Sequence, residues 1–192
     1  MGELKSAFEK AWEKAQKLGK LSSQEIREQK EEEYAPIGRA IAERYLGHGQ
    51  NRIIKEEVNR YSGDEKGIVI RAALSRLVEA IGLESDEVTE KAMEGMLTLR
   101  GKGKIGEINE RIRSIFREYR EAERQKYEVE KGHIESGERE LLHQLRISGS
   151  AVGEINPKAS ETWGRISQEL YPPFNERLEE LKREMLNLAE ES

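Results

Sequence analysis

The fold of this 192-residue chain is decided by residues 105–129, which read IGEINERIRSIFREYREAERQKYEV. Apolar side chains recur every three or four residues through this stretch, at Ile105, Ile108, Ile112, Ile115, Tyr119, Ala122 and Val129. Lys126 is the one gap in the series. Such a heptad spacing places the apolar side chains on one stripe of a helix, and the stripe packs against another helix. The stretch therefore predicts a long helix with a partner along this seam.

Two further seams have the same spacing. The C-terminal one consists of Phe174, Leu178, Leu181, Met185 and Leu188, and the N-terminal one of Leu4, Phe8, Ala11, Ala15 and Leu18. Together the seams predict an all-α, multi-helix bundle with a long, coiled-coil-like antiparallel pairing of helices. We expect the interface seam to be formed by Ile105, Ile108, Ile112, Ile115, Tyr119, Leu178, Leu181, Met185 and Leu188.

The composition agrees with helices that have narrow apolar stripes and broad charged faces. Charged residues make up 37% of the chain, yet the formal net charge is only −5. Glutamate outnumbers aspartate by 36 to 2, and glutamate is the better helix former. The chain has no cysteine, so disulfides and thiolate chemistry are excluded. A composition rich in Glu, Lys and Arg and free of Cys is also typical of thermophile proteins.

Glycine, proline and capping residues indicate where the helices begin and end. Ser22 and Glu25 have the spacing of a capping box, and Ser85 has that of a helix cap. We expect Pro36 to kink or restart its helix and the pair Pro172-Pro173 to break one, because a proline ring clashes with the preceding turn.

The predicted organisation has two parts. Residues 1–100 form a helical globular part, although the helix at 4–18 packs either there or elsewhere. Residues 101–192 form an extended helical hairpin of the long helix and the C-terminal helices. A single continuous domain is the alternative, because a chain of this length fits either organisation.

Two Glu-x-x-His units are candidate metal ligands, namely Glu130 with His133 and Glu140 with His143. Di-iron helical bundles use this unit on two different helices. If one helix carries both units, ten residues separate them by about 15 Å along its axis. Only a sharp hairpin within residues 132–137 would bring them together, so we expect no cofactor.

Residues 100–104 form a basic turn in which Arg100, Lys102 and Lys104 are candidate anion ligands. The sequence GKGKIG at 101–106 matches the Gly-x-Gly-x-x-Gly pattern of dinucleotide sites. That pattern needs a buried strand before it, whereas residues 96–99 suit the end of a helix. A basic turn between two helices is the simpler interpretation.

Residues 147–153, ISGSAVG, form an uncharged segment in this highly charged chain. Small residues allow close approach of a ligand to the backbone. Arg146, Ser148, Ser150 and Trp163 are therefore the candidates for a small-molecule site. A tight connection between helices, without any ligand, explains the same composition.

The segment from Leu99 to Tyr127 contains nine Lys and Arg residues against five Glu. A basic helix can follow the phosphates of a nucleic acid. The interleaved Glu residues instead favour pairing within the helix, so we do not expect nucleic acid as the partner.

Self-association or partner binding along the heptad surfaces is the function that these patterns favour. We expect a non-enzymatic interaction or scaffold protein, either a homo-oligomer (a dimer) or the partner of another protein. A small-molecule or metal-binding bundle is the alternative, and a nucleic-acid-associated protein that uses residues 100–124 is the second. No apolar run reaches the roughly 18 residues of a membrane span, and no signal core is found at the N-terminus. We therefore expect a cytoplasmic protein without a membrane partner.

Overall fold

A computed structural model describes residues 22–48, 50–144 and 161–190 of the chain. These residues form six helices and, within those ranges, no strand. The predicted all-α, multi-helix fold is confirmed. The predicted helix at 4–18 lies outside the described residues. Within the described part, no helix combines the length and the apolar character that a membrane crossing requires.

The contacts of the chain divide it into two compact units, Met1–Arg76 and Leu77–Ser192. The division falls inside helix α4 (Gly63–Glu79). This division reflects where contacts between residues are dense. The boundary predicted near residue 100 was instead placed at a loop because of the composition of that loop. That boundary stays a prediction.

The first unit contains α2 (Ser23–His48), α3 (Asn51–Val58) and most of α4. The predicted capping box begins α2. The Ser22 backbone N–H donates to Glu25 Oε2 at 2.6 Å, and the Glu25 backbone N–H donates to Ser22 Oγ at 3.2 Å. These two bonds satisfy backbone donors that the first helical turn leaves without a partner. The same bonds lower the pKa of the Glu25 carboxyl.

Helix α3 runs antiparallel to α2. An ion pair joins Arg44 to Glu57 at 3.8 Å, and the Tyr34 and Tyr61 rings pack edge to face with centroids 6.0 Å apart. Residue numbers thus rise along one helix as they fall along the other. Ile54 and Val58 of α3 are buried.

Helices α2 and α4 approach each other closely at Gly38. A Cβ atom at this position would lie 2.8 Å from Ala72 Cβ and closer still to the Val69 carbonyl oxygen. Farther along both helices, Arg76 donates to Glu43 at 2.6 Å. Contacts that advance together along the two helices show that α2 and α4 run in the same direction, with α3 as the return segment.

The second unit contains α5 (Asp86–Arg100), α6 (Gly103–Gln144) and α7 (Glu161–Glu190). Ser85 caps α5 as predicted, since its Oγ accepts a hydrogen bond from the Val88 backbone N–H at 3.3 Å. Gly101 ends α5 with a φ of +80°, a conformation that residues with a side chain rarely adopt. Only two residues therefore join α5 to α6, and the two helices form a hairpin.

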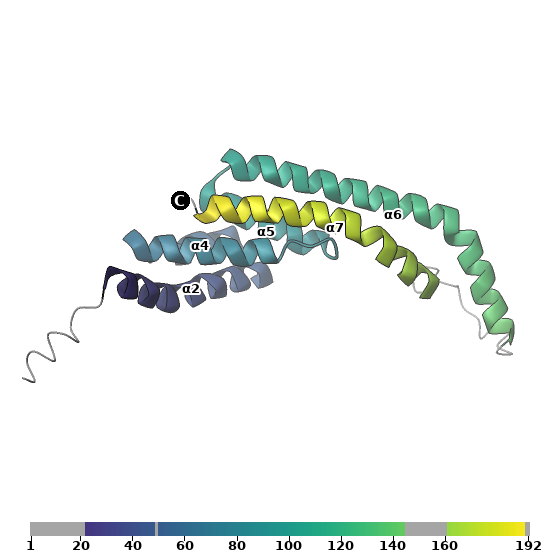
Figure 1. Ribbon diagram of the computed structural model, residues 1–192, viewed down its shortest axis with the longest axis horizontal. Helices are drawn as coiled ribbons and strands as arrows, with labels where there is room; N and C mark the ends of the chain where they lie inside the picture. The colour runs from purple at the N-terminus through teal and green to yellow at the C-terminus, as the bar shows by residue number, and fades with distance from the viewer. Residues whose placement is uncertain (1–21, 49, 145–160, 191–192) are drawn as a thin grey trace, which may run out of the picture. The chain divides into compact units, whose positions relative to one another are not determined.

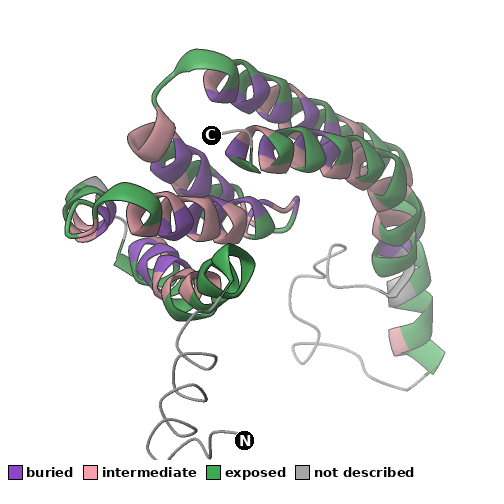
Figure 2. Cartoon of the chain, turned by 60° about the vertical axis from the view of Figure 1, so that its left-hand side comes forward, coloured by how far each residue is buried: buried purple, intermediate pink, exposed green. Residues whose placement is uncertain are grey.

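Helices α6 and α7 lie side by side and run antiparallel (Figure 1). Arg111 pairs with Glu184, and Glu118 pairs with Arg177, each at 2.7 Å. Buried residues recur along the length of both helices (Figure 2). From the predicted seam, the buried members are Ile105, Ile108, Ile112, Ile115, Tyr119, Leu178, Leu181 and Met185. Leu188 is partly buried.

The pair Pro172-Pro173 does not break its helix, and here the prediction is wrong; Pro36 likewise does not restart a helix. Helix α2 continues through Pro36, and α7 continues through Pro172 and Pro173. Each proline removes the hydrogen bond to the carbonyl four residues earlier. All three prolines are exposed. The carbonyls that they leave free therefore lie on a face of the helix that water reaches, which reduces the cost of the lost bonds.

The predicted seam also ends earlier than its spacing indicates. Val129 is 70% exposed rather than buried. After Tyr119, the partly buried residues on this side of α6 are Glu123 and Tyr127, each four residues after the last. The next buried residue along the helix is Ile134. Two consecutive four-residue steps shift the line of buried positions around the helix, because α-helices have 3.6 rather than 3.5 residues per turn.

Replacement of Gly38 by Ala tests the close approach of α2 and α4. We expect Gly38→Ala to lower the free energy of unfolding by about 1–3 kcal/mol, because the new methyl group overlaps the α4 backbone. Gly47→Ala is the matched control on the same helix, because a Cβ there meets nothing within 4 Å. It should be neutral or stabilising by about 0.5–1 kcal/mol. Urea unfolding measures both; equal effects of the two variants would contradict the close approach.

Truncation of one seam residue tests the pairing of α6 with α7. Ile112 is fully buried, so Ile112→Ala should cost about 2–5 kcal/mol through lost burial and a residual cavity. Val129→Ala, on the exposed side of the same helix, should change stability by less than about 0.5 kcal/mol. Thermal and urea unfolding report both values. A loss for Val129→Ala as large as that for Ile112→Ala would refute the described seam.

Candidate functional site

A surface groove between α5 and α6 is the strongest candidate site of the second unit. It has a volume of about 660 Å³ and is open to solvent. Its lining residues come from α5 and from the middle of α6: Asp86, Thr89, Glu90, Met93, Arg113, Phe116, Arg117, Arg120, Glu121 and Arg124. We call it the arginine groove.

Helical spacing explains why four arginines share one wall of this groove. They stand at intervals of four, three and four residues, at Arg113, Arg117, Arg120 and Arg124. These intervals place the side chains on one face of α6 over about three turns. On α5, Asp86 and Glu90 are four residues apart and line the opposite wall. The groove therefore has an acidic wall on α5 and a mainly basic wall on α6, where Glu121 is the one acidic lining residue.

The floor of the groove is apolar and firmly packed. Met93 is buried, and Phe116 is partly buried beside it in the groove lining. Thr89, also buried, bonds to the loop before α5. Its hydroxyl donates to the Gly82 carbonyl at 3.0 Å and accepts from the Gly82 N–H at 3.1 Å. Both hydrogen-bonding functions of this hydroxyl are thus occupied within the chain.

Arg113 bridges the two walls. Its Nε and Nη2 donate to the two carboxylate oxygens of Glu90 at 3.0 and 2.9 Å, and Nη1 donates to Glu110 at 2.6 Å. Paired N–H groups of a guanidinium match a carboxylate in this bidentate geometry. The hydrogen bonds to Glu90 raise the pKa of the Arg113 guanidinium further above physiological pH, so that it stays charged.

Arg120 bridges the walls nearer the start of α5. Its Nη2 donates to Asp86 at 2.7 Å and to the Leu83 carbonyl at 2.9 Å, and Nη1 donates to Glu123 at 3.3 Å. The guanidinium also lies 5.3 Å from the centre of the Tyr119 ring, within the range of a cation–π contact. The bond to Asp86 raises the pKa of the Arg120 guanidinium.

The other two arginines face solvent. Arg124 pairs with Glu121 on its own helix at 2.8 Å. Arg117 is exposed, and among the described residues it has an electrostatic attraction to Glu118, whose pKa its charge helps to lower, but no hydrogen bond or close ion pair. It lies between the two bridging arginines, so it is the cation of the basic wall that is available to a partner.

The predicted anion site does not form one cluster. Arg100 donates to the Ala189 carbonyl at 3.4 Å near the end of α7, where the helix dipole favours a cation. Lys102 and Lys104 are exposed and line two different surface hollows. Helix α5, and not a strand, precedes the glycine pattern, so the arrangement of a dinucleotide site is absent from this described segment.

The two Glu-x-x-His units lie on one continuous helix, since α6 has no hairpin at residues 132–137. His133, Glu140 and His143 are exposed, and Glu130 pairs with Lys126 at 3.5 Å. The structure therefore does not bring the two units together. Among the described residues, no group of three or more acidic or histidine side chains is placed to hold a metal ion.

Of the predicted ligand loop, Arg146, Ser148 and Ser150 lie outside the described residues. Trp163 is described and buried near the start of α7. Its ring packs edge to face on Tyr127 of α6, with centroids 5.4 Å apart. Within the described part, Trp163 thus contributes to the α6–α7 contact.

The basic segment of α6 is more than a helix face exposed to water, because two of its arginines form ion pairs with α5. We expected the arginines of residues 100–124 to pair with Glu on the same helix, and Arg124 does so. Arg113 and Arg120 also pair across the groove. Sequence reasoning missed the acidic wall, because Asp86 and Glu90 are far from these arginines along the chain. The four-three-four arginine spacing was the available signal.

The connection between α4 and α5 is tied to α7 as well as to α6. The Tyr171 hydroxyl donates to Glu84 Oε1 at 2.7 Å. This bond lowers the pKa of the Glu84 carboxyl and raises the pKa of Tyr171 to about 12. The negative charge of Glu84 favours the neutral phenol, and the phenol favours the charged carboxylate.

The Tyr171–Glu84 bond predicts a pH dependence of stability. The raised pKa of Tyr171 stabilises the fold below pH 10, and this contribution is lost between about pH 10 and 12. The lowered pKa of Glu84 stabilises the fold above its ordinary value of 4.5, and this contribution is lost at lower pH. Both side chains reach solvent, so Tyr171→Phe should cost less than about 1 kcal/mol. In urea unfolding, the difference from wild type should be largest at intermediate pH. A difference independent of pH would contradict this bond.

Comparison with known proteins assigns a family. No curated protein and no solved structure shows significant similarity to the chain. One family profile matches residues 55–187, which include the second half of α3 together with α4, α5, α6 and most of α7. The match contains the whole arginine groove and covers more than half of the chain. The chain belongs to DUF6657, a family of unknown function.

Proposed function

We propose that this chain is a non-enzymatic interaction protein that binds a protein partner through the arginine groove. The observation that carries the proposal is the composition of the groove: an apolar floor between two walls of opposite charge. Arginine, methionine and aromatic residues are enriched at the centres of protein interfaces. Arg113, Met93 and Phe116 supply these three types here.

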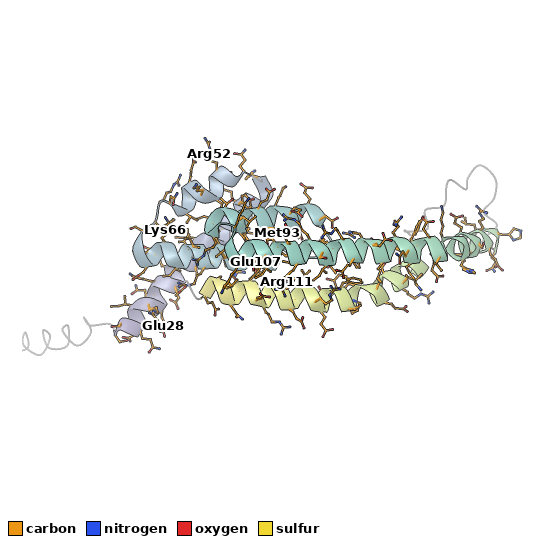
Figure 3. The ribbon with its side chains drawn as sticks, turned by 90° about the horizontal axis from the view of Figure 1, so that it is seen from above. Glu28, Arg52, Lys66, Met93, Glu107 and Arg111 are labelled. Carbon is orange, nitrogen blue, oxygen red and sulfur yellow. The ribbon has the colours of Figure 1, made fainter. Side chains whose placement is uncertain are left out.

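The α6–α7 seam supports the same conclusion by exclusion. Its apolar side chains are covered by one another within one chain, so they are not free to bind a partner. Figure 3 shows Arg111 on α6 beside α7, where its ion pair with Glu184 closes the edge of the seam. A partner that binds α6 therefore has to use another face of this helix, and the arginine groove lies on such a face.

The pairing of the groove arginines favours binding over proton transfer. The pKa values of Arg113 and Arg120 are raised, so both groups stay charged and do not act as general acids or bases. Their ion pairs hold the side chains in place before any partner arrives. Such preorganisation reduces the entropy that is lost on binding.

A comparison of tagged baits tests the proposal. Three full-length baits are compared: wild type, Arg117→Glu and Arg139→Glu. Arg117→Glu reverses a charge in the groove. Arg139→Glu makes the same change at an exposed site far along α6 and serves as the control. Recovery of specific partners, quantified by mass spectrometry, should fall about tenfold or more for Arg117→Glu, since loss of a buried charged contact costs at least 1.4 kcal/mol. Untagged copies of the chain itself count as a partner in this comparison.

The control should recover the same partners as wild type. Equal recovery with all three baits would contradict the groove as the binding surface. Recovery of partners by wild type no greater than by an unrelated helical bait would contradict an interaction role.

A further inference from the structure

The distribution of charge in the arginine groove restricts what can occupy it. Asp86 and Glu90 stand on the α5 wall, opposite the four arginines of the α6 wall. A partner with a single sign of charge, such as a nucleic acid or a strongly acidic peptide, would lie against like charges on one wall. Like charges in contact oppose binding and disfavour such partners. The occupant that fits has an acidic and a basic edge side by side.

The groove of a second copy has these two edges. A two-fold axis along the groove places the acidic wall of each copy against the basic wall of the other. A two-fold axis across the groove would instead place acidic against acidic and basic against basic. Because residues of both copies exchange the same contacts, each favourable pair occurs twice in a symmetric dimer.

We propose that the occupant of the arginine groove is a second copy of this chain, with the dimer axis along the groove. This inference rests on the proposed function and names its partner. Helices α5 of the two copies then run parallel, and each packs opposite α6 of the other copy. The apolar floors formed by Met93 and Phe116 face each other at the centre.

Arg117 provides the contact that the isolated chain lacks. On α6 it stands between Arg113, which pairs with Glu90, and Arg120, which pairs with Asp86. At the same level of the groove, it faces the interval between Asp86 and Glu90 of the second copy. Both carboxylates are about half exposed in the single chain. A carboxylate has lone pairs for more than one guanidinium, so each can accept Arg117 without giving up its own arginine.

The size of the face predicts a dimer that depends on concentration. Helix α5 has 15 residues, so it is about 22 Å long. Two adjacent helices of about 10 Å diameter then offer a face of roughly 450 Å². A standard stable interface buries about 800 Å² on each partner. The dimer should therefore dissociate on dilution and weaken as salt screens the exposed charges.

Sedimentation velocity over a series of protein concentrations tests the inference on the full chain. Wild type should show a monomer–dimer equilibrium that shifts toward monomer at about 1 M salt. Arg117→Glu should weaken the dimer at least tenfold in Kd, because it places a carboxylate against Asp86 and Glu90 of the second copy. Arg139→Glu should leave the Kd unchanged. Far-UV circular dichroism shows whether each variant is folded.

A mixture of charge-reversed chains gives a second and independent readout. Glu90→Lys should also weaken self-association, since it places a cation against the basic wall. Mixed with Arg117→Glu, it should form a heterodimer more tightly than either variant forms a homodimer. This recovery requires contact between the two walls, and a loss of folding does not produce it. If Glu90→Lys does not fold, the comparison of Arg117→Glu with Arg139→Glu still decides.

Three results would overturn the inference. The first is a wild-type chain that stays monomeric at the highest concentrations, and the second is a dimer that Arg117→Glu does not weaken. The third is a dimer that Arg117→Glu and Arg139→Glu weaken equally. A monomeric wild type together with other proteins whose recovery depends on Arg117 would leave the proposed function standing and replace the second copy by a different partner. A monomeric wild type with no such protein would refute both.

Discussion

The rest of the second unit depends on the burial of one apolar stripe of α6 against α7. Ile108, Ile112 and Leu178 belong to this stripe and its partner on α7 and are almost completely buried. Each such side chain contributes about 1.5–3 kcal/mol through burial, so the stripe outweighs the exposed ion pairs at its edges. Because the two helices are antiparallel and belong to one chain, the seam needs no second chain to be covered.

A single helix, α6, thereby provides two different surfaces. Its apolar stripe faces α7, and a stripe of arginines lies on the side that faces α5. The Gly101 turn fixes α5 as the antiparallel neighbour of α6 and thus sets its Asp86 and Glu90 opposite Arg120 and Arg113. The buried seam holds α6 in place, and the arginine groove is the surface through which we propose that it binds a partner.

The sequence predicted what depends on local spacing and missed what depends on neighbours in space. The seam of α6, the α5 cap at Ser85 and the capping box before α2 are all encoded within a few residues, and all were found. Whether Pro172 ends a helix depends on whether water reaches the freed carbonyl, which spacing does not reveal. The arginine groove was missed for the same reason, since Glu90 and Arg113 meet only through the α5–α6 hairpin.

A cross-link between α6 and α7 would show whether these helices close the seam within one chain. The chain has no cysteine, so Glu118→Cys and Arg177→Cys introduce one pair of thiols where an ion pair joins the two helices at 2.7 Å. At high dilution, a short thiol-reactive cross-linker should join the two thiols within single chains, seen as a monomer mass plus one linker. Covalent dimers at that dilution, or no cross-link at all, would contradict the account.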